Sequence, residues 1–234
     1  MILENETWTR VRDSDLSSKV ALLPTGSTEQ HGPHAPLCTD SLIASEVAGE
    51  TASRTDAVSL PPVTVGVSEE HRGFDGTLHV SPDTFRSYVS DILTSLSCHG
   101  CERAVLVNGH GGNIDALDEV CAETTRSGDM FATTWTWWNA VDDPDFDMGH
   151  AGPLETSLVL HLEPELVDDD SVEGGAESWG EYVECSPVSY DTDDFTQNGV
   201  VGDPTRASAE KGEELFEDAV SSLSRLVEWV DENR

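Results

Sequence analysis

Glutamate, histidine and aspartate residues near the start of the chain have the types and spacing of metal ligands. Glu29 and His31 are two residues apart, and Asp40 follows at the expected start of a helix. Alternate residues of an extended segment point to the same side, so Glu29 and His31 can ligate one divalent ion or two adjacent ones. Asp40 can supply a carboxylate that bridges two ions. We therefore predict that this segment builds part of a metal site.

Further clusters of histidines and acids repeat this combination along the chain. They contain Glu70 with His71, His110 in a glycine-rich segment, and His150 with Glu155. A single loop histidine is more often only hydrogen-bonded, but the clusters follow predicted strands or begin helices in a chain with eight histidines. Imidazole and carboxylate ligands suit Zn, Mn or Fe(II), among which the sequence does not choose.

The order of apolar segments predicts the elements that position these clusters. Short apolar runs typical of buried strands cover residues 20–24, 58–65, 103–107 and 130–135. Patterns typical of helices cover residues 40–54, 81–100, 114–125, 155–162 and 207–230. This alternation predicts an α/β fold with a mostly parallel sheet and helices on both faces. Ligands of such sheets bind at the carboxyl ends of the strands, where the clusters lie.

The charge balance excludes some partners and indicates a solvent. Forty-six Asp and Glu residues oppose twelve Lys and Arg residues, giving a formal net charge of -34. Nucleic acids and anionic membranes require positive surfaces, so we expect neither as a partner. A hydrophobic fraction of 37% and six tryptophans favour a packed interior over disorder. A carboxylate-rich chain with only two lysines, Lys19 and Lys211, is typical of a halophile, where salt screens self-repulsion.

Other sequence features indicate a cytoplasmic protein of one domain. No apolar run approaches the roughly 18–20 residues that span a bilayer. Five cysteines, an odd number, favour reduced thiols, and the pair Cys98 and Cys101 lacks the second pair of a zinc site. We expect one domain over residues 1–234, with an acidic, irregular and solvated excursion at about 163–198.

Several sequence blocks resemble the signature blocks of the creatininase (creatinine amidohydrolase) family. They are LPTGSTEQHGPH at 23–34, NGHGGN at 108–113, HAG and ETS within 150–157, and GVVGDP at 199–204. The likeness extends from residue 20 to about residue 212. Within the family, the first two blocks and the SPV sequence at 186–188 favour the branch of peptidases that trim a ribosomal precursor peptide during mycofactocin maturation.

This resemblance implies a two-metal hydrolase with a three-layer α/β/α fold, which assembles as a homo-oligomer, commonly a hexamer. By position in the blocks, Glu29, Asp40 and His110 would hold one ion, and His31 would share Asp40 to hold the other. Creatininase has a glutamate ligand where this chain has Gly112. We expect Glu155 to replace that ligand, and the difference argues against creatinine itself as the substrate.

The implied chemistry is hydrolysis of an amide or peptide bond. Two bound ions would lower the pKa of a bridging water and polarise the scissile carbonyl. His150 and Glu155 are the expected catalytic residues, with His150 passing a proton to the leaving nitrogen. Substrate contacts are expected from Glu70, His71, Trp135 and Trp137, together with Trp138.

Three alternatives to a precursor-peptide peptidase stay open at this stage. One is a deformylase acting on a formamide in flavin or deazaflavin synthesis, and another is a hydrolase of creatinine-like cyclic amides. Both keep the metal site and change the substrate. The third is a non-catalytic acidic scaffold that binds cations, which predicts many weak sites and no dependence on His110.

Overall fold

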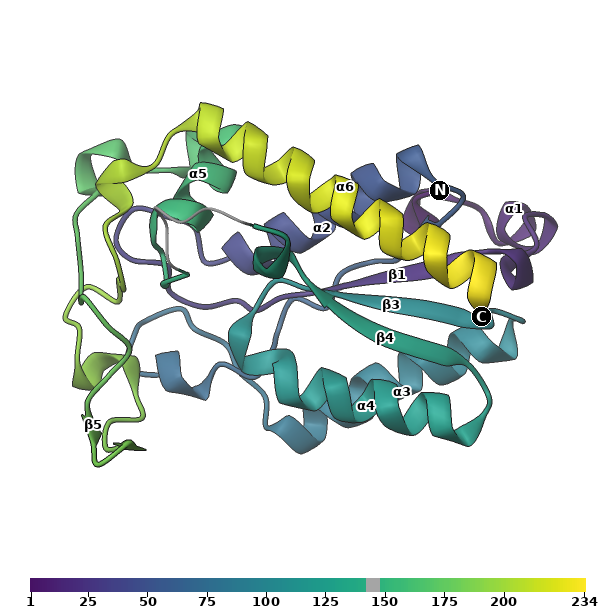
Figure 1. Cartoon of the computed structure of the whole chain (residues 1–234), viewed down its shortest axis with the longest axis horizontal. Helices are drawn as coiled ribbons and strands as arrows, with labels where there is room; N and C mark the ends of the chain where they lie inside the picture. The colour runs from purple at the N-terminus through teal and green to yellow at the C-terminus, as the bar shows by residue number, and fades with distance from the viewer. Residues whose placement is uncertain (142–147) are drawn as a thin grey trace.

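The computed structural model describes residues 1–141 and 148–234. Its centre is a parallel four-stranded sheet in the order β2-β1-β3-β4 (Figure 1). The strands are β1 (Val20–Thr25), β2 (Val58–Ser59), β3 (Arg103–Asn108) and β4 (Phe131–Thr136). β3 pairs along its whole length with both β1 and β4. All strands therefore end at the same edge of the sheet, on the left in Figure 1.

Helices cover both faces of the sheet and make the three-layer fold that the resemblance implies. One face carries α2 (Thr39–Arg54), α5 (Pro153–Leu162) and α6 (Ala209–Asn233), and the other carries α3 (Pro82–Cys98) and α4 (Ile114–Ser127) (Figure 1). A short helix, α1 (Trp8–Asp13), precedes the sheet. Short 3-10 helices lie at Leu3–Asn5, Leu16–Ser18, Glu69–His71, Gly111–Asn113, Trp137–Ala140, Pro164–Leu166, Asp169–Ser171, Thr192–Asp194 and Pro204–Arg206.

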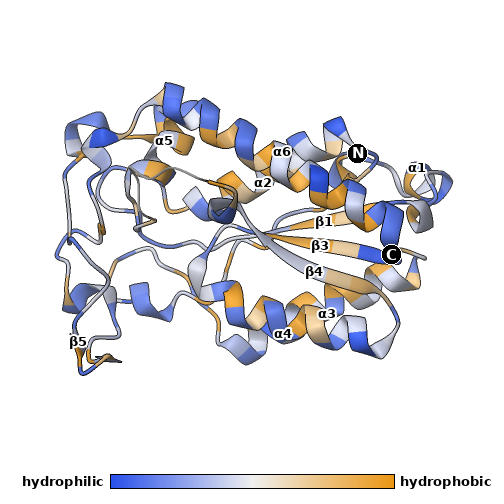
Figure 2. Ribbon diagram, viewed as in Figure 1, coloured by the Kyte–Doolittle hydropathy of each residue, from blue (hydrophilic) through white to orange (hydrophobic). Residues whose placement is uncertain are grey.

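Two apolar cores explain why the layers stay together. Alternate strand residues point to opposite faces, so Leu22 and Val105 pack under α2, α5 and α6, while Leu23 and Leu106 pack against α3 and α4. Figure 2 shows the apolar residues of α6 turned toward the sheet. Burial of both sheet faces accounts for the apolar β1 and β3 sequences.

Local signals fix the ends of the helices close to their expected positions. Ser81 accepts a hydrogen bond from the backbone N–H of Thr84 at 3.3 Å, and Pro82 occupies the first helical position of α3. Ser208 likewise accepts from the backbone N–H of Lys211 at the start of α6. The predicted helices are therefore confirmed to within a few residues.

The second strand is much shorter than predicted. A strand was expected over 58–65, but β2 contains only Val58 and Ser59. Pro61 and Pro62 follow after Leu60, and they lack the N–H groups that a continuing strand requires. The chain returns to the sheet at Val63, whose N–H donates to the carbonyl of Pro24 at 2.9 Å. The proline pair thus turns an expected strand into two separate contacts.

The acidic segment 163–198 contains short 3-10 helices and a small antiparallel pair, β5 (Tyr182–Val183) and β6 (Ser186–Pro187). Most of its side chains are exposed, and it lies beyond the carboxyl ends of the strands (Figure 1). The cysteines are all free. Within the described residues, no helix combines the length and apolarity needed to cross a membrane.

Candidate metal centre

The carboxyl edge of the sheet brings the predicted ligands together. Glu29 and His31 lie in the loop after β1, and Asp40 occupies the first turn of α2. His110 lies two residues after the end of β3, and Glu155 lies in the first turn of α5. These side chains are buried although all can carry charge. Burying such groups is unfavourable unless they are paired or coordinate an ion.

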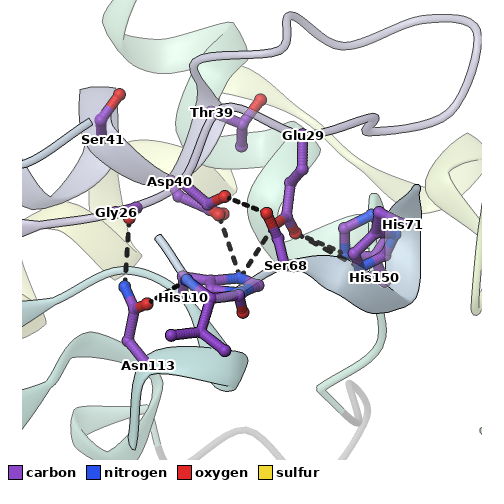
Figure 3. A network of polar contacts seen from close by, with 12 residues as sticks. Gly26, Glu29, Thr39, Asp40, Ser41, Ser68, His71, His110, Asn113 and His150 are labelled. Atoms are coloured by element: carbon purple, nitrogen blue, oxygen red, sulfur yellow. Dashed lines mark hydrogen bonds and ion pairs between the residues drawn. The ribbon is translucent and has the colours of Figure 1, made fainter. Parts of the chain in front are cut away.

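Glu29, Asp40 and His110 converge on one point (Figure 3). Nδ1 of His110 lies 3.2 Å from Oε2 of Glu29 and 3.2 Å from Oδ2 of Asp40. Among the described residues, both Glu29 oxygens and Asp40 Oδ2 lack a hydrogen-bond partner. Unpartnered buried oxygens are costly, and a divalent cation would satisfy them.

The backbone orients His110 for this task. Nε2 of His110 donates to the carbonyl of Val67 at 2.8 Å, which leaves the Nδ1 lone pair directed at the two carboxylates. In the metal-free chain, burial lowers the pKa of His110, but Glu29 and Asp40 outweigh burial and raise that pKa well above its usual value. In the metal-free chain, a proton on His110 thus supplies the positive charge that the carboxylates of Glu29 and Asp40 attract.

His31 builds a second point of convergence beside the first. Its Nδ1 donates to the backbone carbonyl of Glu29 at 3.2 Å, so the lone pair is on Nε2, on the opposite side of the ring. That Nε2 lies 3.1 Å from Oδ1 of Asp40 and 3.8 Å from Oε1 of Glu155. Asp40 therefore presents one oxygen to His110 and the other to His31, as a bridging carboxylate would.

Glu155 is held in place by a backbone N–H group from a residue in a strained conformation. Oε2 of Glu155 accepts the backbone N–H of Ala151 at 2.6 Å, which leaves Oε1 on the side of His31. Ala151 adopts a φ of 51°, a left-handed conformation that is costly for a residue with a side chain. The backbone donor at Ala151 therefore keeps the carboxylate of Glu155 beside the histidine.

His71 and His150 complete the cluster around Glu29 (Figure 3). Their rings stack with centroids 4.3 Å apart, and His150 also lies 4.4 Å from the ring of His31. Nε2 of His71 is 3.4 Å, and Nδ1 of His150 is 3.8 Å, from Oε1 of Glu29. Burial, together with neighbouring histidines, lowers the pKa of both residues and keeps them neutral.

Three overlapping groups of buried side chains have ligand atoms close enough to hold an ion. They are Glu29–His31–Asp40, His31–His150–Glu155 and Glu29–His71–His150. The donor set and its unpartnered atoms fit divalent metal, as expected from the sequence. Glu70 lies at the edge, 3.7 Å from His110, and burial raises its pKa.

Backbone crowding explains the glycine at position 112. A Cβ there would clash with the carbonyl of Val67 and would lie 2.6 Å from Nε2 of His110 and 2.9 Å from Oε1 of Glu70. Any side chain at Gly112 would therefore disturb the His110–Val67 hydrogen bond. The structure instead places the carboxylate of Glu155 beside His31.

A pocket of about 390 Å³ opens above the cluster. Its wall contains Trp138 from the segment after β4, and Trp179, Tyr182 and Tyr190 from the acidic segment. The ring of Trp179 lies 6.1 Å from that of His150. The segment expected as a solvated excursion therefore supplies aromatic side chains to the pocket, which sequence reasoning missed. The aromatic residues scattered in an otherwise acidic stretch were the available signal.

Trp135 and Trp137 correct the expected aromatic wall. Trp137 is fully buried in the core under α6, and Trp135 packs against the same core while its Nε1 donates to Ser222 at 3.4 Å. Their place at the end of β4 turns them toward α6. Of Trp135, Trp137 and Trp138, Trp138 is the one that lines the pocket.

The fold and this buried cluster define a hydrolase-like α/β protein with a candidate metal centre at the carboxyl edge of its sheet. The family model of creatininase, described as creatinine amidohydrolase, matches residues 4–227. The chain belongs to the creatininase family. It is an amidohydrolase of that family and acts on C–N bonds.

Individual relatives have several activities. The chain is 37% identical to the mycofactocin precursor peptide peptidase of Mycolicibacterium smegmatis, over 90% of this chain and 85% of the relative. It is 30% identical to creatinine amidohydrolase of Pseudomonas putida, over 89% and 88%. A Methanobrevibacter smithii deformylase of a formylamino-pyrimidinone ribonucleotide is 26% identical, over 88% of both chains.

Solved structures of creatininase share the fold of this chain, and the descriptions of some of them name a metal. A mutant creatininase described as the Zn–Zn type superposes with a TM-score of 0.83 at 28% identity, covering 97% of this chain and 96% of that one. A creatininase described as the Mn form gives 0.82 at the same identity and coverage. These forms and the buried cluster support divalent-metal binding.

Proposed function

We propose that this chain is a metal-dependent peptidase that cleaves the modified mycofactocin precursor peptide. The convergence of unpartnered Glu29 and Asp40 oxygens with His31 and His110 carries the hydrolase chemistry. The substrate rests on the likeness to the peptidase relative. The aromatic pocket wall offers apolar surface for a peptide side chain.

Two divalent ions are proposed, of Zn, Mn or Fe(II). Glu29, Asp40 and His110 would hold one, and His31, Asp40 and Glu155 the other, because these are the oxygen and nitrogen atoms that converge. When bound, such ions supply a water of lowered pKa and an electrophile for the amide carbonyl.

The remaining chemistry belongs to His150. Its Nε2 donates to the carbonyl of Gln30 at 2.7 Å, so Nδ1 is the free basic nitrogen and faces Glu29. A lowered pKa keeps this nitrogen unprotonated at neutral pH. His150 can accept the proton of the nucleophilic water and return it to the leaving nitrogen. Glu155 assists by holding its carboxylate near His31, and Glu70 lines the substrate side of the pocket.

A deformylase is the second candidate, because a relative with that activity matches most of the chain. The Zn²⁺-loaded protein would be incubated in high salt with the modified precursor peptide, the formylamino-pyrimidinone ribonucleotide and creatinine, and products followed by mass spectrometry. We expect cleavage of the peptide alone. Hydrolysis of only the formamide would replace the peptidase proposal with the deformylase.

Variants separate an enzyme from a cation-binding scaffold. We expect Asp40→Ala and His110→Ala to lose stoichiometric metal and peptide cleavage together. His99→Ala is the matched control, because His99 is exposed at the end of α3. Retention of metal and activity in both site variants would show that the site is assigned wrongly.

We also propose a cytoplasmic, high-salt setting and a homo-oligomeric assembly. The net charge of -34 and the free cysteines support the first. Exposed aromatic residues such as Tyr88 and Trp229 supply apolar area for subunit contacts. Sedimentation in molar KCl measures the assembly, and a purely monomeric species would refute the proposed homo-oligomer.

We propose one domain over residues 1–234, including the acidic segment.

A further inference from the structure

We propose that Gln30 is a positioning residue that fixes the tautomer of His71, so that the protonated nitrogen of His71 faces Glu29 and His71 is excluded from the metal ligands. The inference rests on the proposed metal centre but not on the identity of the substrate. It concerns the group Glu29–His71–His150, whose spacing alone would admit an ion.

The side-chain amide of Gln30 has only one orientation that its neighbours allow. Its Oε1 accepts the backbone N–H of Gly32 at 2.9 Å, and its Nε2 donates to the backbone carbonyl of Gly199 at 3.0 Å. A backbone N–H can only donate and a carbonyl can only accept, so exchanging the oxygen and nitrogen would break both bonds. The NH₂ group is therefore fixed on the side of His71.

Gly199 explains how the backbone approaches Gln30 so closely. It has a φ of 78°, in the left-handed region, and a Cβ at this position would clash with the Gln30 amide. The glycine of the GVVGDP block therefore supports the orientation of Gln30 from a position 169 residues away.

The fixed amide decides which nitrogen of His71 carries a proton. Nε2 of Gln30 lies 2.9 Å from Nδ1 of His71, and its second hydrogen needs an acceptor there. Nδ1 of His71 must then hold a lone pair, so the proton of the neutral ring is on Nε2. This N–H faces Oε1 of Glu29 at 3.4 Å. A protonated nitrogen cannot ligate a metal, so His71 directs an N–H at a ligand instead of becoming one.

The other histidines of the cluster have the opposite arrangement. His110 donates to Val67, His31 to the carbonyl of Glu29, and His150 to the carbonyl of Gln30. Each therefore directs a lone pair toward the buried carboxylates. Gln30 consequently gives two stacked rings opposite arrangements relative to Glu29. Its backbone carbonyl accepts from His150, and its side-chain amide donates to His71.

The arrangement gives the two oxygens of Glu29 different neighbours. Oε1 faces the His71 N–H, and Oε2 lies 3.2 Å from Nδ1 of His110. One oxygen thus faces an N–H group, while the other is directed to the proposed ion. Outer hydrogen bonds of this kind orient the ligands of metal sites.

Histidine-selective ¹⁵N NMR of the full-length, Zn²⁺-loaded protein tests this directly. The His71 signals would be assigned by their loss in His71→Gln. We expect a protonated Nε2 and an unprotonated, pyridine-type Nδ1, without the shift that zinc causes. A zinc-shifted or unprotonated Nε2 would overturn the inference. This measurement needs no other variant, so it decides the matter even if Gln30 substitutions do not fold.

Gln30→Glu then tests the role of the amide. A carboxylate offers no hydrogen to Nδ1 of His71, so we expect Nδ1 to become protonated. Thr192→Val is the matched control: it removes the hydroxyl 3.2 Å from the same nitrogen and leaves Gln30 intact. We expect its His71 spectrum to match the wild type. An unchanged spectrum in Gln30→Glu, or the same change in both variants, would refute the assignment to Gln30.

Zinc stoichiometry provides an independent readout. His71→Gln should bind as many zinc ions as the wild type, because the residue is not a ligand, whereas His110→Gln should bind fewer. Loss of one equivalent in His71→Gln would overturn the inference while leaving the proposed function intact. If the wild type bound none of Zn²⁺, Mn²⁺ and Fe²⁺, the proposed function would fail, and the His71 tautomer in the metal-free protein would still test the role of Gln30.

Discussion

Nε2 of His110 lies 2.8 Å from the backbone carbonyl of Val67, and this hydrogen bond directs Nδ1 toward Glu29 and Asp40. The bond links the end of β3 to the loop that follows β2. The space around it is so limited that position 112 must be glycine.

Gly112→Ala should weaken zinc binding. Its Cβ would clash with the carbonyl of Val67 and displace the ring of His110. Loss of such an outer hydrogen bond costs about 10- to 100-fold in metal affinity. Gly111→Ala is the matched control, because a Cβ at Gly111 meets open space. Competition titrations with a zinc chelator measure both variants, and equal affinities would contradict the proposed role of the bond.

Zinc should stabilise the protein more as pH rises. In the metal-free chain, the carboxylates overcome burial and raise the pKa of His31 and His110 well above normal. A raised pKa contributes stability that is complete below the unfolded value of about 6.5 and is lost as pH rises through the folded value. The metal-free Tm should therefore fall toward alkaline pH.

Zinc has to displace those protons, so its apparent affinity should increase over the same range. The difference in Tm between zinc-loaded and metal-free protein should widen as pH rises above about 6.5. Calorimetry in buffers of different ionisation enthalpy should detect proton release on binding. A difference in Tm that narrows as pH rises would show that metal does not displace protons from these histidines.

Trp179→Ala should impair substrate binding without removing metal. The indole lines the pocket beside His150 and is 43% exposed, so it has area available for a substrate. We expect KM for the precursor peptide to rise roughly fivefold, equivalent to about 1 kcal/mol, with unchanged zinc content. Trp8→Ala, an exposed tryptophan outside the pocket, is the control. Equal effects of the two variants would remove Trp179 from the substrate site.

Thermal stability should increase from low to molar KCl. Repulsion among the surplus carboxylates destabilises the folded chain, and molar salt shortens its range to about 3 Å. Differential scanning calorimetry across a KCl series measures this, with sucrose at matched osmolality as the control for excluded solute. A Tm that responds equally to both, or to neither, would argue against a high-salt protein.

Sequence reasoning succeeded where the structural signal is local. The apolar runs of β1 and β3 and the N-cap at Ser81 give strands and helices near their predicted bounds, because side-chain period and capping depend on neighbouring residues. The ligand candidates Glu29 and His110 were found for the same reason, since strand ends reach one edge of the sheet. Their ligand roles stay a prediction.

Sequence reasoning failed where packing decided. The prolines at 61 and 62 shortened β2, and the twist of the chain after β4 buried Trp137 while Trp138 reached the pocket. Aromatic periodicity cannot show which face of a segment a distant helix covers. The contribution of Trp179 likewise depends on how the acidic segment folds back over the sheet edge.

The sequence by itself determined the kinds of atoms at the site: imidazoles and carboxylates placed after strands and at helix starts. Only the tertiary structure decided which nitrogen of each imidazole is free. Val67 sets His110 across 43 residues, and Gln30 sets His150 across 120. A ring has two similar nitrogens, and the hydrogen bond made by one decides the function of the other, so partners brought together by folding convert equivalent histidines into ligands, a base and a donor.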